Sequence, residues 1–266
     1  MRESWALIRS TWLTAASYRM AMLVSLFGLA FVLLPLYFVA NALQPTMQHA
    51  IAAEAHQYFG FVVLGAVAFS LITSCCTALP SALDGAIGRG TFEVILGTPA
   101  RLSAICIGFM GYGVLWALLR GVILFAVAVL LGLSVVWKAV PLGAALLALT
   151  MLSYVGIGLL FAALILTFRT TGPLSAAVLT ASMLLGGVYY PTQVIPSWIR
   201  DLGAVVPLTY GLRAIRQVVL LGDPLTAVVR DVGILVAITV VTMVLGVTAF
   251  SFALRHARRA GTLSSY

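Results

Sequence analysis

Long apolar runs dominate this sequence and set the strongest limit on its fold. An α-helix needs ~20 apolar residues to cross a bilayer, and six runs approach or exceed that length. Charged residues make up 8% of the chain, against about 25% in soluble domains. The sequence therefore predicts an all-α polytopic membrane protein with six transmembrane helices over residues 20–266. The expected spans are Met20–Ala42, Tyr58–Leu79, Leu102–Val136, Leu142–Phe168, Leu174–Tyr190 and Val232–Leu254.

The first residues, 1–19, show a different pattern from the spans. Trp5, Ile8, Trp12 and Ala16 follow helical spacing, and arginines occupy other positions. This pattern predicts an amphipathic helix that lies in the membrane interface before the first span. A simple extension of the first spanning helix is the alternative.

Basic residues are distributed unevenly between the two sides of the expected membrane. If the N-terminus lies inside, nine arginines fall inside, four arginines and one lysine fall outside, and Arg120 lies in a span. Because cytoplasmic loops carry an excess of Arg and Lys, this count predicts cytoplasmic N- and C-termini. The net charge of +8 thus reflects topology, and we expect no nucleic-acid partner.

The segment 187–231 interrupts the series of spanning helices. It carries three prolines, Pro191, Pro196 and Pro207. Proline lacks an N–H and clashes with the preceding turn, so each one ends or starts a helix. Trp198 and Tyr210, whose rings favour the headgroup level, lie between these breaks. We expect an outer re-entrant hairpin with short helices over 197–206 and 210–221, each too short to cross the membrane.

The connection 80–101, between the second and third runs, is longer than a turn requires. Residues 91–96 fit a short helix with an apolar stripe beside Glu93, and Gly97-Thr98-Pro99 would end it. Such a helix on the cytoplasmic face suits docking in a groove of another protein. A solvated inner loop with an interfacial helix is the alternative.

Arg120 is the one charged residue inside an expected span. A charge at the centre of a membrane helix costs at least ~2.5–3.5 kcal/mol, so Arg120 should face protein or water. Tyr112 and Trp116 share its helical face and would line a substrate path with it. Snorkelling of Arg120 and ordinary aromatic packing are the alternatives.

Motifs for catalysis or metal binding are missing from the sequence. A phosphate-binding loop requires a Gly-Lys pair, but Trp137 precedes the sole lysine, Lys138. The three histidines do not form a His-Glu-x-x-His zinc motif, and none lies in a span to activate Ser134 as a nucleophile. We therefore expect no catalytic residues, no metal site and no cofactor in this chain.

Several segments resemble the signature of the ABC-2 type permease family, the membrane subunits of ABC exporters. Three of them lie in the re-entrant segment: Gly187-Val-Tyr-Tyr-Pro191, Ile195-Pro196-Ser-Trp198-Ile-Arg200 and Val206-Pro207-Leu-Thr-Tyr210-Gly-Leu-Arg213-Ala-Ile-Arg216. Residues 90–99, Gly-Thr-Phe-Glu-Val-Ile-Leu-Gly-Thr-Pro, are similar to the family's coupling-helix region. Weaker similarity extends over nearly the whole chain.

The resemblance implies a permease subunit in a bacterial plasma (inner) membrane. ATP and Mg²⁺ would bind to two copies of a separate cytoplasmic ATPase, and a second permease, identical or different, would complete a path for an amphipathic drug, lipid or lipid-linked polysaccharide. ATPase contacts are expected at Asp84, Arg89, Phe92, Glu93, Thr98 and Pro99. An outer gate is expected at Tyr190, Pro191, Pro196, Trp198, Pro207, Tyr210 and Arg213.

An ATP-independent secondary carrier or channel is the competing function class. Such proteins usually place Asp, Glu or His within their spans to couple ion movement to transport. Here the expected spans carry no charge apart from Arg120, so the composition favours the ATP-driven class.

Overall fold

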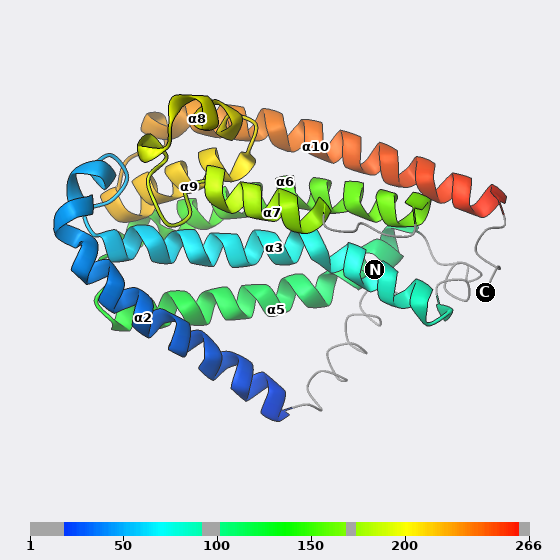
Figure 1. Cartoon of the computed structure of the whole chain (residues 1–266), viewed down its shortest axis with the longest axis horizontal. Coiled ribbons are helices and arrows are strands. Elements are labelled where there is room, and N and C mark those ends of the chain that lie inside the picture. The colour runs from blue at the N-terminus through cyan, green and yellow to red at the C-terminus, as the bar shows by residue number, and fades with distance from the viewer. Residues whose placement is uncertain (1–18, 92–101, 169–173, 261–266) are drawn as a thin grey trace.

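The protein is a bundle of α-helices, seen in a computed structural model that describes residues 19–91, 102–168 and 174–260 (Figure 1). Its long helices are α2 (Arg19–Ile51), α3 (Tyr58–Gly88), α5 (Leu102–Leu130), α6 (Val140–Phe168) and α10 (Leu225–Ala260). The shorter elements are η1 (Trp137–Ala139), α7 (Leu174–Leu185), η2 (Thr192–Val194), α8 (Ser197–Gly203), α9 (Pro207–Arg216) and η3 (Gln217–Leu221). The described residues contain no strand, and the all-α prediction is confirmed.

Four described helices are long and apolar enough to cross a membrane. They are Tyr58–Gly88, Gly113–Leu130, Trp137–Phe168 and Leu225–His256. Helices α8 and α9–η3, bent by 90° at a short break, would make a fifth if they count as one span. Helix α2 covers the predicted first span, but its side chains up to residue 32 lie outside the described part. The chain is therefore a multi-pass membrane protein, and the number of six spans stays a prediction.

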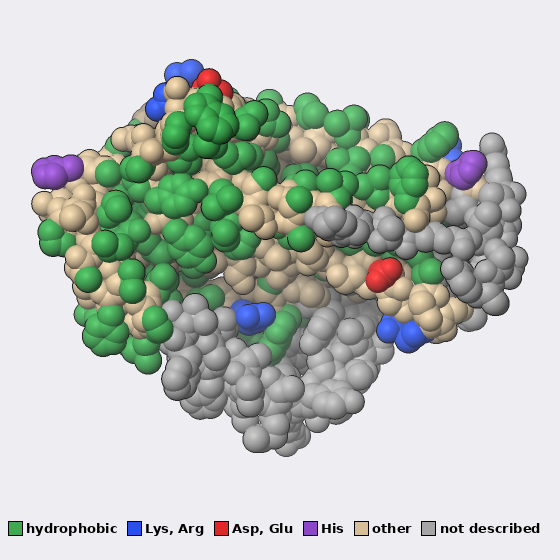
Figure 2. All heavy atoms as spheres, viewed as in Figure 1, with side chains coloured by type: hydrophobic (Ala, Val, Ile, Leu, Met, Phe, Trp, Pro, Cys, Tyr) green, Lys and Arg blue, Asp and Glu red, His purple; other side chains and the backbone are tan. Residues whose placement is uncertain are grey.

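Helix α3 occupies the centre of the bundle. In the most apolar stretch of α3, 72% of the residues are buried, whereas 17% are buried in the corresponding stretch of α10. Helix α3 packs against α2, α5 and α6. Helices α2, α5 and α6 thus pack around α3, while α10 packs on α6 and α9 and turns most of its apolar side chains outward. Figure 2 shows one face of the molecule, where hydrophobic side chains cover much of the described surface and charged ones are few. This distribution is the one expected where lipid replaces water around the protein.

Small residues allow the helix backbones to approach closely. A Cβ atom on Gly246 of α10 would lie 2.3 Å from the carbonyl oxygen of Gly156 on α6. A Cβ atom on Gly158 would lie 2.8 Å from the carbonyl oxygen of Cys76 on α3. Between α6 and α10, Ser153 and Thr239 also share a hydrogen bond of 2.5 Å. Close backbone packing and interhelical hydrogen bonds are what hold helices together in lipid.

Two helices extend further than the sequence predicted, and both contain proline. Helix α2 continues past Pro45 to Ile51. There the Gln44 side chain donates to the carbonyl oxygen of His56 and accepts from the backbone N–H of Tyr58, at 3.0 and 2.6 Å. Local hydrogen bonds of this kind allow polar residues to remain in a helix that leaves the bilayer. Helix α3 continues past Pro80 to Gly88, so the first part of the predicted connection 80–101 is helical.

The predicted fifth span, Leu174–Tyr190, is helical only as α7. Its 12 residues extend about 18 Å, less than the ~30 Å hydrocarbon core of a bilayer. The chain turns after Leu185, and Gly187 adopts a φ of +68° that favours glycine. Helix α10 begins at Leu225, seven residues before the predicted start of the last span at Val232. The predicted interfacial helix lies outside the described residues except for Arg19.

The close contact of α6 with α10 predicts opposite effects for two glycine substitutions on α10. Gly246→Ala places a Cβ atom against backbone, and such overpacking costs about 1–3 kcal/mol. Gly233→Ala is the matched control, because nothing lies within 4 Å of its added Cβ and alanine favours helix by about 1 kcal/mol. We expect a lower thermal midpoint in detergent for Gly246→Ala and an equal or higher one for Gly233→Ala. Equal midpoints for the two variants would contradict this packing.

Candidate functional site

The segment 186–224, here called the hairpin, has the broken form that its prolines predict. After the turn at Gly187, helix α8 covers Ser197–Gly203 and helix α9 begins with Pro207 in its first turn. The two helices meet at 90°. A π-turn, η3, follows α9 and ends at Gly222, whose φ is +79°. The hairpin lies at the end of the bundle where α2 ends and α3 begins, and we call this the hairpin end (Figure 1).

Arg216, near the end of α9, connects the hairpin to the rest of the bundle. Its side chain is only 2% exposed, and Nη1 donates to Oε2 of Glu54 at 3.0 Å. Nε and Nη2 donate to the carbonyl oxygen of Phe61 at 3.2 and 3.0 Å. Nη2 also donates to the carbonyl oxygens of Gly187 and Val188, each at 3.0 Å. The guanidinium lies 3.4 Å from the centre of the Phe61 ring. One side chain thus joins the α2–α3 turn, α3, the turn after α7, and α9.

The contact between Arg216 and Glu54 is a buried ion pair rather than a surface one. The Glu54 side chain is 8% exposed, and arginine keeps its positive charge in proteins. Removing one partner of such a pair leaves a buried charge and typically costs 3–5 kcal/mol. The pair therefore holds the hairpin in one position.

Further contacts fix the turn after α7 against α3. The Tyr58 hydroxyl donates to the carbonyl oxygen of Tyr189 at 2.7 Å. A Cβ atom on Gly65 would lie 2.2 Å from the carbonyl oxygen of Val188, so only glycine permits this approach. Gln217 also donates to the carbonyl oxygen of Ala53 at 3.3 Å. The hairpin and the N-terminal half of α3 form one packed unit.

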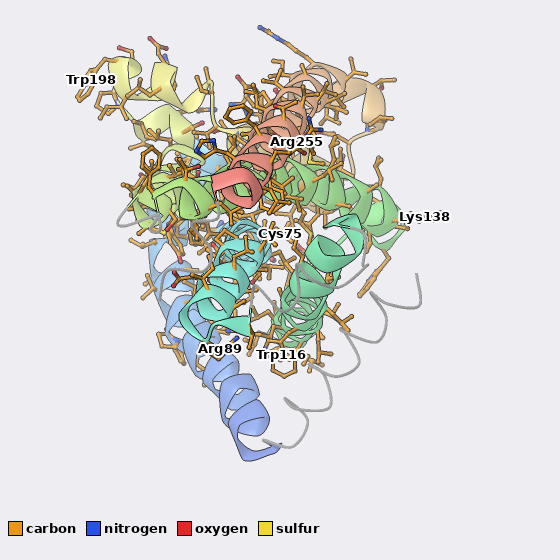
Figure 3. The ribbon with its side chains drawn as sticks, turned by 90° about the vertical axis from the view of Figure 1, so that its right-hand side faces the viewer. Cys75, Arg89, Trp116, Lys138, Trp198 and Arg255 are labelled. Carbon is orange, nitrogen blue, oxygen red and sulfur yellow. The ribbon has the colours of Figure 1, made fainter. Side chains whose placement is uncertain are left out.

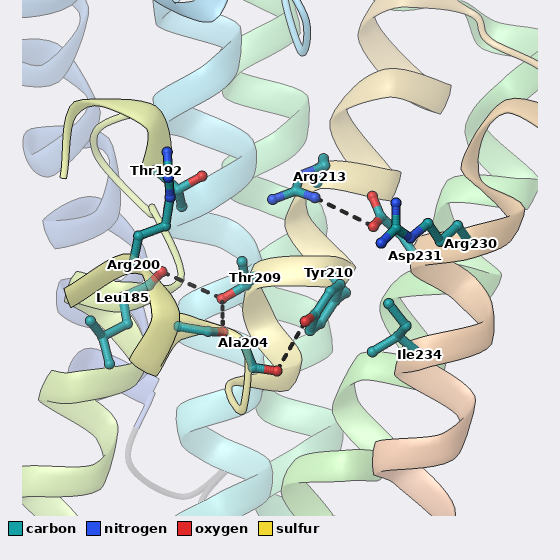
Figure 4. Close-up of a pocket in the computed structure, with 11 residues that line it drawn as sticks. Leu185, Thr192, Arg200, Ala204, Thr209, Tyr210, Arg213, Arg230, Asp231 and Ile234 are labelled. Carbon is teal, nitrogen blue, oxygen red and sulfur yellow. Dashed lines mark hydrogen bonds and ion pairs between the residues drawn. The ribbon is translucent and has the colours of Figure 1, made fainter. Parts of the chain in front are cut away.

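A cavity of about 330 Å³ lies between α8, α9 and the start of α10 (Figure 4). Two of the predicted gate residues, Tyr210 and Arg213, line it. The Tyr210 hydroxyl donates to the carbonyl oxygen of Ala204 at 3.0 Å, and Nη1 of Arg213 lies 3.4 Å from Oδ1 of Asp231. These contacts hold α9 against α8 and α10.

The other predicted gate residues lie around this cavity. Tyr190 and Pro196 line a second, apolar cavity beside it, Pro191 and Pro207 are buried, and Trp198 is 69% exposed. The structure thus gathers all seven predicted gate residues in one hairpin.

Sequence reasoning missed Arg216 and Glu54. The available signal was an arginine amid apolar residues near the end of α9, together with the sole acid in the connection 44–57.

Of the predicted ATPase-contact residues, the structure describes only Asp84 and Arg89. Asp84 lies in the last turns of α3, and Arg89 follows its final residue; this end of α3 lies opposite to the hairpin end (Figure 1). The guanidinium of Arg89 reaches back over Gly85. The other four, Phe92, Glu93, Thr98 and Pro99, lie outside the described residues.

The candidate substrate-path residues lie on α5, away from the hairpin. Trp116 is half-buried, and the side chain of Tyr112 lies outside the described part. The Nε atom of Arg120 is buried and has no hydrogen-bond partner among the described residues. A role for Arg120 in a polar path stays a prediction. In the described ranges no three His, Cys, Asp or Glu side chains come together as metal ligands would.

Comparison with known proteins identifies related chains. A family model described as "ABC-2 type transporter" matches residues 2–220, a range that contains both Glu54 and Arg216. Nodulation protein J of Rhizobium leguminosarum bv. trifolii is 28% identical over 179 residues, 67% of this chain and 68% of that protein. Nodulation protein J of Rhizobium meliloti (strain 1021) is 26% identical over 185 residues, 69% and 70% of the two chains. Inner membrane transport permease YadH of Escherichia coli (strain K12) is 29% identical over 161 residues, which are 60% of this chain and 62% of that protein.

The buried ion pair predicts a large loss of stability for Arg216→Gln, about 3–5 kcal/mol, because Glu54 is left unpaired and buried. Glu54→Gln should cost a similar amount. Because the two side chains contact each other, the double variant should lose less than the sum of the two single losses. Thermal unfolding of the purified protein in detergent measures all three.

Arg213→Gln is the matched control for this measurement. This substitution removes the same charge three residues earlier on α9. The Arg213 side chain is 36% exposed, and its contact with Asp231 is long, at 3.4 Å. The loss should stay below about 1 kcal/mol. Equal losses for Arg213→Gln and Arg216→Gln, or strict additivity of the Glu54 and Arg216 variants, would contradict the role assigned to the pair.

Proposed function

This chain belongs to the ABC-2 type transporter family, and we propose that it forms the translocation path of an exporter driven by ATP. The observation that carries the proposal is the family match over residues 2–220, which covers the bundle up to the end of the hairpin. Members of this family are transmembrane permease subunits of ABC transporters and work with a separate ATPase subunit. The composition of the spans adds support, since the most apolar stretches of the described helices carry few charged residues.

In the proposed complex, two permease subunits and two ATPase subunits act together. ATP and Mg²⁺ bind to the ATPase subunits, and association of these subunits moves the segment 80–101 of each permease. The second permease is a copy of this chain or a different one. The transported molecule is amphipathic, such as a drug, a lipid or a lipid-linked polysaccharide, because the path between two such bundles is lined by mainly apolar helices.

The proposed location is a bacterial inner membrane with both termini in the cytoplasm. The excess of arginine in the connections on that side supports this orientation. The name of the relative YadH, an inner membrane transport permease, supports it as well. In this orientation the hairpin end faces outward, and the hairpin serves as the outer gate of the path.

Helix α3 provides a direct connection between the two proposed sites of action. Its first turns contact Arg216 and the turn after α7, and its last turns carry Asp84 and Arg89. A helix of 31 residues extends about 46 Å. A displacement imposed by an ATPase at one end of α3 would therefore reach the hairpin at the other end through one continuous helix.

The proposed contact with the ATPase predicts that Glu93→Arg strongly weakens the binding of this chain to the ATPase. A charge-assisted hydrogen bond contributes ~1.5–3 kcal/mol, so we expect binding to the ATPase to weaken by roughly 10- to 150-fold. Membrane insertion should be unaffected, because Glu93 lies between the expected spans. Co-purification with the ATPase and substrate-stimulated ATP hydrolysis measure the effect.

Arg101→Lys is the control, because it keeps the positive charge at the expected start of the third span. Its effect on ATPase binding and on coupling should be mild. Normal co-purification and normal coupling in Glu93→Arg would show that 80–101 is a solvated inner loop. Transport by this chain alone in liposomes, without ATPase or ATP, would contradict the proposed function and favour a secondary carrier or channel.

A further inference from the structure

The cavity between α8, α9 and α10 carries an excess of positive charge. Arg200 from α8, Arg213 from α9 and Arg230 from α10 line it, and Asp231 is the only acid among its lining residues (Figure 4). Three positive charges and one negative charge leave a net charge of +2. Asp231 pairs with Arg213 at 3.4 Å. Within the described residues, the guanidinium groups of Arg200 and Arg230 make no hydrogen bond and no salt bridge, although Arg230 lies close enough to Asp231 for their charges to interact.

Two of the three hydroxyl groups that line this cavity already donate to the protein. The Thr209 hydroxyl donates to the carbonyl oxygen of Gly203 at 3.0 Å, and the Tyr210 hydroxyl donates to that of Ala204 at 3.0 Å. Among the described residues, the polar lining side chains without a hydrogen bond are therefore those of Arg200, Arg230 and Thr192. Each guanidinium presents several N–H groups in a planar fork that matches the oxygens of a phosphate or carboxylate. The cavity is suited to an anion with several oxygens.

A second cavity, of about 460 Å³, adjoins the first on the other side of α8. Its lining is mainly apolar and comes from α7, the segment around η2, and α8. The lining residues are Ala181, Leu184, Leu185, Tyr190, Val194, Ile195, Pro196 and Ile199. Leu185 lines both cavities, so the two adjoin each other at that side chain. A ligand that fits both has an anionic group joined to an apolar chain.

The position of these cavities also matches the headgroup level of a membrane. Trp198, two residues before Arg200 on α8, is 69% exposed. Leu202 and Val205, which follow, are 58% and 77% exposed. Exposed tryptophan beside arginine is typical of the membrane–water interface. A lipid phosphate at that level would meet the basic cavity, while its acyl chain would lie beside apolar side chains.

We propose that the two cavities bind one anionic phospholipid of the surrounding membrane. Its phosphate contacts Arg200, Arg213 and Arg230, and part of one acyl chain fills the apolar cavity beside Leu185. The lipid connects α7, α8, α9 and α10. This site does not depend on the transported substrate, and it would exist even if the proposed transport function were wrong.

Native mass spectrometry of the full chain in detergent tests the proposal. Dioleoyl phosphatidylglycerol is the anionic probe, and dioleoyl phosphatidylcholine is the zwitterionic one. We expect tighter binding of the first phosphatidylglycerol than of the first phosphatidylcholine. Each basic side chain near a membrane surface contributes about fivefold, so Arg200→Gln/Arg230→Gln should weaken phosphatidylglycerol binding by about 25-fold. Binding of phosphatidylcholine should change little.

The matched control is Lys138→Gln/Arg255→Gln, which removes the same charge from exposed residues outside the cavity. Lys138 lies on the opposite side of the bundle from Trp198, and Arg255 near the far end of α10 (Figure 3). This variant should bind phosphatidylglycerol like the wild type. An equal loss in both double variants would show general attraction by net charge and overturn the proposal, as would equal binding of the two lipids by the wild type.

A third variant separates a lipid from a free anion. Ala181→Phe places a ring in the apolar cavity and leaves every arginine unchanged. This substitution should weaken the binding of dioleoyl phosphatidylglycerol at least fivefold and leave the binding of the short-chain dihexanoyl phosphatidylglycerol unaffected. Full binding of the long-chain lipid by Ala181→Phe, together with displacement by millimolar inorganic phosphate, would show a site for free phosphate and overturn the assignment to a lipid.

Discussion

The buried ion pair between Arg216 and Glu54 is the interaction on which the position of the hairpin depends. Helices as short as α8 and α9 are marginal on their own, so they need contacts from the rest of the bundle to hold one arrangement. Beside the buried apolar side chains of α9, Arg216 supplies polar contacts through its bonds to Glu54, to Phe61, and to the turn at Gly187 and Val188. A guanidinium whose three nitrogens all donate to fixed oxygens gives the hairpin a single geometry.

The pair also explains why α3 is central to the proposed mechanism. Phe61 and Tyr58 in its first turns hold the hairpin, and Gly65 lets the turn after α7 lie directly against it. At the other end, α3 leads to the segment expected to contact an ATPase. One continuous helix therefore contacts both regions.

The sequence predicted the helical class and the broken hairpin because both follow from local chemistry. Apolar runs exclude water, and the closely spaced Pro191, Pro196 and Pro207 interrupt the helix in the hairpin, whereas Pro45 and Pro80 lie inside α2 and α3. The predicted positions of the helix ends were less accurate, because the hydrogen bonds of Gln44 to His56 and Tyr58 let α2 continue into polar sequence. The importance of Arg216 could not be read from its neighbours. Arg213 has the same chemistry one turn earlier but is half-exposed, and only the tertiary arrangement brings Glu54 to Arg216.

Hydrogen exchange of the backbone tests most directly whether this pair holds the hairpin. The measurement compares the purified wild type with Glu54→Gln, a substitution in the α2–α3 turn and outside the hairpin sequence. If the pair holds the hairpin, exchange becomes faster in residues 186–190 and 207–221 and stays unchanged in the packed middle of α6 and α10. Unchanged exchange in the hairpin, or a uniform increase over all helices, would contradict this role of the pair.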